Sequence, residues 1–139
     1  MADFQNKIVI TNAGRAAIGS MLDTGTPAIQ ISAFSVGTGG YLSANPTVVI
    51  PPDPSANTLI NEIFRSSNVG RETLSNTTRV YIGILNPGDA VGAIGEFGLW
   101  ATYLSGPNAS TTFLFAVMHT PIKSMTPEDS YVFRIPVIL

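Results

Sequence analysis

The sequence predicts a mostly β, α+β domain: an antiparallel β-sandwich-like fold with one N-terminal helix. Runs of β-branched and aromatic residues recur between turns rich in Gly, Pro, Ser and Asn. Helical periodicity is clear in one early stretch, at about residues 11–23. The chain has 139 residues, which is the length of one domain with its own core. Residues 1–139 are therefore expected to form a single domain that is β-rich over residues 29–139.

The expected helix follows a short strand, KIVIT. Thr11 or Asn12 can cap its first turn, apolar side chains then recur on one face, and Gly25 can end it. Gly14 and Gly19 each weaken such a helix by about 1 kcal/mol relative to Ala. The helix must therefore be stabilised by packing, and its glycines would permit close approach to a sheet.

The rest of the chain is typical of strands joined by turns. Alternation begins at Ile29, with Ile31 and Ala33 on the same side, and ends at a Gly-rich turn. Residues Ala44–Asn57 include four prolines and predict a long loop or an extended crossing segment. TLINEIFRSS fits either periodicity, and we favour the extended form. The remaining strand candidates are TRVYIGILN, VGAIGEFGLWATYL, TTFLFAVMHTPI and SYVFRIPVIL.

The low charge content indicates a protein with partners. Charged residues make up 12% of the chain, about half the usual share, and charge is depleted at the centres of protein–protein interfaces. The alternative is a solvent-exposed surface that is unusually poor in charged residues. A net charge of -2 without a basic stripe argues against nucleic acid, and the chain has neither a polybasic cluster nor a bilayer-length apolar run. The lack of cysteine excludes disulfides and thiolate metal sites.

Residues that could carry chemistry are sparse. His119 is the only histidine, and we expect it at the surface near a strand end. One histidine with carboxylates is a poor ligand set for a transition metal. The turn SVGTGG resembles a phosphate-binding loop but lacks the lysine and the helix that such loops require. Glu128 and Asp129 are neighbours in an expected solvated turn. The sequence predicts no catalytic, cofactor-binding or metal-binding residue.

Glu96 is the most informative carboxylate, because it interrupts the uncharged run GAIGEFGLW. In a strand it would share a face with Ile94 and Trp100. A half-buried carboxylate needs a partner. We predict a bidentate structural pair between Glu96 and Arg65, with Arg79 as the weaker candidate. An interface or ligand role for Glu96 is the alternative.

The ordered motifs resemble the N-terminal module of the tail-collar fibre proteins of contractile phages. In that family a T-x-x-G helix start is followed by a VG-x-GG turn, an L-x-N-E-x-x-R segment and an IGE-x-G-L strand. The matching positions here are Thr11 and Gly14; Val36, Gly37, Gly39 and Gly40; Leu59, Asn61, Glu62 and Arg65; and Ile94, Gly95, Glu96, Gly98 and Leu99. The match spans nearly the whole chain.

The resemblance implies a structural virion protein without enzymatic activity or cofactor. It would be a short tail fibre, or the module that attaches a fibre to the baseplate, acting by oligomeric assembly. The implied partners are its own copies in a homotrimer, a baseplate protein and a separate receptor-binding fibre protein. That last partner is expected because long fibre proteins continue into a shaft and tip, whereas this sequence stops at Leu139. The implied location is the virion tail, after synthesis in the host cytoplasm.

A possible interface is the Gly-rich turn. Gly37, Gly39, Gly40 and Tyr41 are expected to shape a turn near a subunit contact, with Trp100 also at an interface.

Two other classes of function are considered. A carbohydrate-binding module could stack host glycans on Tyr41, Tyr103 and Trp100 and hydrogen-bond them through Asn108. A depolymerase using carboxylates is the third possibility and the weakest, because no facing carboxylate pair is evident.

Overall fold

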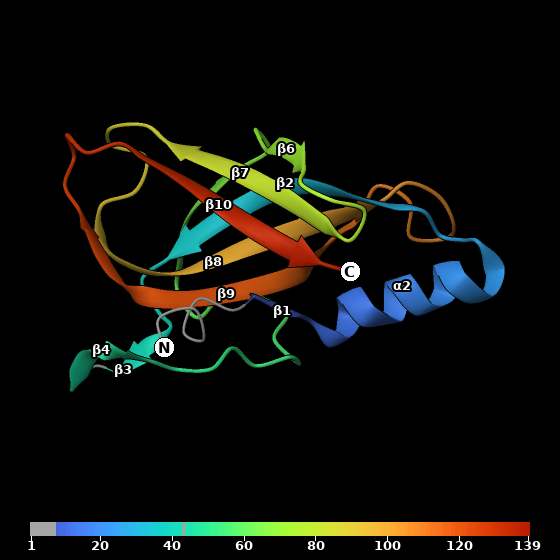
Figure 1. Cartoon of the computed structure of the whole chain (residues 1–139), viewed down its shortest axis with the longest axis horizontal. Helices are drawn as coiled ribbons and strands as arrows, with labels where there is room; N and C mark the ends of the chain where they lie inside the picture. The colour runs from blue at the N-terminus through green and yellow to red at the C-terminus, as the bar shows by residue number, and fades with distance from the viewer. Residues whose placement is uncertain (1–7, 43) are drawn as a thin grey trace.

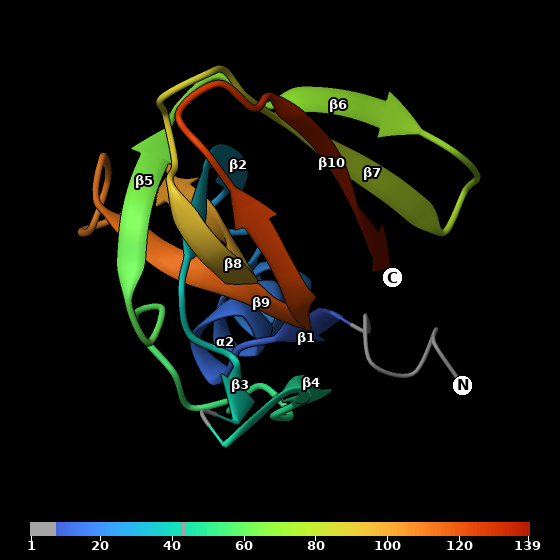
Figure 2. The same ribbon diagram turned by 90° about the vertical axis from the view of Figure 1, so that its left-hand side faces the viewer.

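A computed structural model describes residues 8–42 and 44–139. Two antiparallel sheets pack face to face, and the helix α2 (Asn12–Thr24) lies at one end of them (Figure 1). The larger sheet has the strand order β1-β9-β8-β2-β5 and the smaller has the order β10-β7-β6. A separate β3-β4 ribbon lies on the other side of the larger sheet from β6, β7 and β10 (Figure 2). The predicted sandwich-like α+β fold is confirmed.

The strands have the following bounds. The five-stranded sheet contains β1 (Ile8–Ile10), β9 (Thr112–Met125), β8 (Gly92–Tyr103), β2 (Ile29–Gly37) and β5 (Glu62–Ser66). The three-stranded sheet contains β10 (Tyr131–Ile138), β7 (Thr78–Leu85) and β6 (Gly70–Thr73), and the ribbon contains β3 (Tyr41–Leu42) and β4 (Asn45–Val49).

The predicted strands are present, and the structure has additional short strands. Lys7, the first residue of the predicted KIVIT strand, lies outside the described residues. The short strands β3 and β6 were not predicted. The strand β4 lies inside the Pro-rich segment, for which the sequence predicted a long loop or an extended crossing segment, and it is the extended form. Proline lacks an N–H for strand pairing, and its presence at position 46 is compatible with β4 because, among the described residues, this strand pairs with β3 alone.

The helix has the predicted ends. The Thr11 side chain accepts a hydrogen bond from the Gly14 N–H at 3.0 Å, and its hydroxyl donates to the Leu114 carbonyl at 2.6 Å. Gly25 ends the helix at φ +76°, where its N–H donates to Met21. A Cβ at position 14 would lie 2.7 Å from the Phe115 carbonyl oxygen, so this glycine permits the close approach to β9. Within the described ranges, no helix is long and apolar enough to cross a membrane.

The main core lies between the two sheets and is centred on Phe133 of β10. The Phe133 ring lies 4.5 Å from that of Phe97 and 5.2 Å from that of Phe34, measured between centroids. Gly83 is opposite Phe133 in the β7–β10 register, and a Cβ at Gly83 would collide with the ring. The core therefore joins aromatic side chains of β2 and β8 to one aromatic side chain of the smaller sheet.

Two bulges correct the predicted side-chain faces. The β2–β8 register shifts between Ile31 and Ala33, so Phe34 joins Ile31 in the main core while Ala33 packs on the outer face. The β8–β9 register shifts between Ile94 and Glu96. Ile94 consequently faces the main core, not the face of Glu96 as alternation predicted.

A second apolar cluster covers the outer face of the five-stranded sheet. Trp100, Leu114 and Val117 from β8 and β9 pack there against Leu59, which precedes β5. The Asn12 N–H also donates to the Pro54 carbonyl, which ties this long segment to the start of α2. The segment that leads from Pro54 to β5 is thus held against the outer face of the five-stranded sheet, close to Glu96.

Candidate functional site

The best-defined polar site is the glutamate cradle, formed by Glu96 and the backbone of Gly39, Ile60 and Asn61. Glu96 is fully buried in β8. Its Oε1 accepts a hydrogen bond from the Ile60 N–H at 2.8 Å. Its Oε2 accepts from Gly39 at 2.9 Å and from Asn61 at 2.8 Å. One carboxylate therefore joins three chain segments: β8, the turn after β2 and the segment that leads into β5.

The predicted Glu96–Arg65 pair is wrong. Arg65 instead binds Glu62 at 2.9 Å. The strand β2 separates β5 from β8, and Arg65 lies opposite Ser35 in the register. The Glu96 carboxylate is satisfied by backbone N–H groups, so it needs no guanidinium, whose burial would carry a desolvation cost. Arg79 lies in the other sheet and donates to the Ser75 carbonyl at 2.8 Å.

The cradle requires glycine on both of its sides. A Cβ at Gly37 or Gly39 would lie 2.5 or 2.7 Å from Glu96 Oε2. A Cβ at Gly95 would lie 2.5 Å from the Tyr41 ring, and Gly40 has φ +95°. The predicted turn at these glycines is present, and it packs against β8 of the same chain. Its position near a subunit interface stays a prediction.

His119 lies beside the cradle and is buried, which corrects its predicted surface location. It is opposite Glu96 in the β8–β9 register and is 4% exposed. Its Nδ1 donates to the Ile50 carbonyl at 2.6 Å. The missed feature was the segment around Ile50, which covers this part of β9 and excludes water from the ring.

Trp100 is also buried, so its predicted role at an interface does not fit the structure. The side chain is 6% exposed, and its Nε1 donates to Ser35 Oγ at 2.8 Å. The Arg65 guanidinium carbon lies 3.7 Å from the ring centroid, which is a cation–π geometry. Arg65 thus covers Trp100 at the surface, and the Arg65 guanidinium is bound by Glu62.

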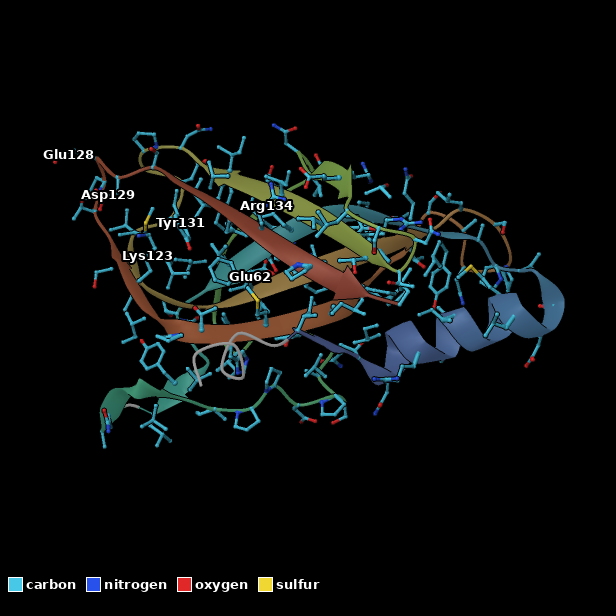
Figure 3. All side chains as sticks on the ribbon, viewed as in Figure 1. Glu62, Lys123, Glu128, Asp129, Tyr131 and Arg134 are labelled. Atoms are coloured by element: carbon cyan, nitrogen blue, oxygen red, sulfur yellow. The ribbon has the colours of Figure 1, made fainter. Side chains whose placement is uncertain are left out.

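The remaining acidic candidates are exposed. Glu128 and Asp129 lie in the turn between β9 and β10, far from α2 (Figure 3). Asp129 Oδ2 accepts a hydrogen bond from the Thr126 N–H at 2.8 Å, which lowers the pKa of this carboxyl. The predicted solvated turn is confirmed. Among the described residues, no cluster of three or more His, Cys, Asp or Glu side chains could hold a metal ion.

The donors of the glutamate cradle are all backbone N–H groups of the same chain. The arrangement is therefore suited to holding chain segments together. Sequence reasoning singled out Glu96 and the glycines but missed Ile60 and Asn61. Their side chains carry no signal, because the groups that bind Glu96 are their N–H groups. A carboxylate between glycines could have suggested backbone donors, since glycine permits close approach of the main chain.

Comparison with protein-family models and with curated proteins finds no match to the chain.

Proposed function

We propose that this chain is a structural attachment module of a contractile phage tail, either a short tail fibre or the part that joins a fibre to the baseplate. The proposal rests on the ordered motifs described above and on one structural observation, an exposed apolar sheet face. The module acts by assembly and not by chemistry on a substrate.

The apolar face is the outer surface of β7 and β10. Val132 and Ile84 are directly opposite one another in the register, and their exposed fractions are 57% and 49%. Ile138, farther along β10 on the same face, is 71% exposed. Arg134 lies between Val132 and Ile138 on this face, so the exposed apolar side chains form a cluster at Val132 and Ile84 and a separate one at Ile138. Clustered exposed apolar side chains rimmed by polar residues mark interaction sites. Because these side chains are about half to two thirds exposed, covering one of them contributes about 1–2 kcal/mol.

The charges on this face are already paired. Arg134 of β10 binds Glu72 of β6 at 2.5 Å across the intervening strand β7. A partner could therefore cover the face without burying an unpaired charge from these two residues. In the proposed particle, the partners are two further copies in a homotrimer, a baseplate protein and a separate receptor-binding fibre protein. The chain is then part of the virion tail.

The aromatic side chains proposed to stack on a glycan pack within the described part of the chain. Trp100 is buried beneath Arg65, and the Tyr103 ring packs on Phe113 with 4.8 Å between centroids. The Tyr41 ring lies against Gly95 of β8, where an added Cβ would come within 2.5 Å of it.

The proposal is tested by the solution mass of the protein, measured by light scattering after size-exclusion chromatography. The expected mass is about three times the 14.7 kDa of the chain. Val132→Glu should reduce the mass to that of a monomer, because it places a charge in the apolar contact. Leu104→Glu is the matched control, since Leu104 is similarly exposed (56%) in the β8–β9 connection.

A monomer that also fails to co-purify with tail baseplates would refute the proposal. A trimer that Val132→Glu leaves intact would refute the assignment of the β7–β10 face while supporting assembly through another surface.

A further inference from the structure

A cavity of about 490 Å³ lies between α2 and the adjacent ends of the two sheets. Its wall is mainly apolar and includes Ile18 and Met21 of α2, Ile31 of β2, Phe115 of β9 and Val137 of β10. This volume is in the range of sites that hold small organic ligands. The glutamate cradle and the exposed face of β7 and β10 do not contribute to this wall.

Two arginines of the three-stranded sheet also line the cavity. Arg71 donates from its guanidinium to the Ile31 carbonyl, and Arg79 donates from Nη1 to the Ser75 carbonyl at 2.8 Å. These contacts hold each guanidinium in place and leave other N–H donors available, since arginine carries five. Tyr81 contributes a phenol ring to the same lining.

These two guanidinium groups lack a carboxylate partner among the described residues. Glu72, next to Arg71 in sequence, is bound to Arg134. Arg65 is bound to Glu62. The cavity therefore combines an apolar wall with two positioned cations whose charge is not balanced by an ion pair within the described chain.

We propose that this cavity binds an amphipathic carboxylate, that is, an aliphatic acid with its chain against the apolar wall and its carboxylate on Arg71 and Arg79. Guanidinium groups match carboxylates in geometry and form strong charge-assisted hydrogen bonds with them. The protein has a net charge of -2, so a general attraction of anions does not account for such binding. The site goes beyond the proposed assembly function, which requires no small ligand.

The test is a titration of the purified protein with decanoate below its micelle-forming concentration, followed by calorimetry and by amide NMR shifts. Saturable binding at one site is expected, with shifts at Ile18, Met21 and Val137. Decanol has the same chain without the charge, and it should bind at least about tenfold more weakly. Absence of saturable decanoate binding overturns the proposal, as does equal affinity for decanol.

Four variants locate the site. Arg71→Gln and Arg79→Gln should each weaken decanoate binding by roughly tenfold, the effect of one charged hydrogen bond. Lys123→Gln removes a cation near Tyr131, at the opposite end of the molecule from α2 (Figure 3), and should not change the affinity. Met21→Trp should reduce binding by filling the cavity.

Thermal melting identifies variants that are not folded, and only folded ones are scored. Unchanged affinity in both arginine variants, or an equal loss in the Lys123 variant, overturns the proposal.

Discussion

Removing the Glu96 carboxylate should be among the most destabilising single changes in this protein. Glu96→Ala leaves the N–H groups of Gly39, Ile60 and Asn61 without their acceptor. A hydrogen bond to a charged group contributes about 1.5–3 kcal/mol, and the three are not additive because water can enter the space left by the side chain. We expect a loss of about 4 kcal/mol in the free energy of unfolding, a large share of the 5–15 kcal/mol typical of a domain.

Glu96→Gln separates the acceptor requirement from side-chain volume. Its amide oxygen can replace Oε2 and accept from Gly39 and Asn61, but its NH₂ group then faces the Ile60 N–H. The Ile60 N–H and the glutamine NH₂ are then both buried donors without an acceptor, which costs at least about 2 kcal/mol. Wild type, the glutamine variant and the alanine variant should therefore rank in that order of stability.

Arg65→Ala distinguishes the observed cradle from the pair that the sequence predicted. If Arg65 were the partner of Glu96, the arginine and glutamate variants would be similarly unstable. In the structure, Arg65 contributes an exposed ion pair with Glu62 and a contact with Trp100, together about 1 kcal/mol.

The assay for all three variants is equilibrium unfolding in urea, together with thermal melting. The alanine variant should melt about 12 °C below wild type, from about 3 °C per kcal/mol for a domain of this size. Amide hydrogen exchange should show Ile60 and Asn61 losing protection more than the amides of β7. A Glu96→Ala loss below about 1 kcal/mol, or an equal loss in Arg65→Ala, would refute the reasoning.

Two further predictions concern the helix and the β9–β10 turn. Gly14→Ala should destabilise the protein by about 1–3 kcal/mol because its Cβ would lie 2.7 Å from the Phe115 carbonyl oxygen. Gly19→Ala, whose Cβ would have nothing within 4 Å, should stabilise it by up to about 1 kcal/mol; urea unfolding that ranks the two variants in reverse would contradict this. The Thr126 N–H bond holds the pKa of Asp129 below its usual value, so its stabilising contribution is present above the unfolded-state pKa and is lost as pH falls through the folded-state value. An NMR titration of the Asp129 carboxyl should show that lowered midpoint, and a midpoint at or above the ordinary value of 3.8 would contradict it.

The predictable parts of the fold are those that depend on local chemistry. The Thr11 cap and the Gly25 end were evident because capping uses side chains and backbone angles of adjacent residues. The long strands β7 to β10 were evident because their apolar and β-branched runs are bounded by turn residues. The side-chain faces of β2 and β8 could not be predicted past their bulges. A bulge reverses which side chains point to the core, and it leaves no clear signal in the sequence.

The sequence by itself determined the sandwich-like class, the single helix within the described chain, the glycine turn and the need for Glu96 to have a partner. Only the tertiary structure decided which groups bind the Glu96 carboxylate. The donors are N–H groups of Gly39, Ile60 and Asn61, which every residue except proline possesses, so residue identity could not reveal them. Their convergence on one carboxylate arises only when segments about 35 to 57 residues from Glu96 cross the same sheet. For the same reason His119 is buried: the segment around Ile50 covers it, and no local pattern encodes that contact.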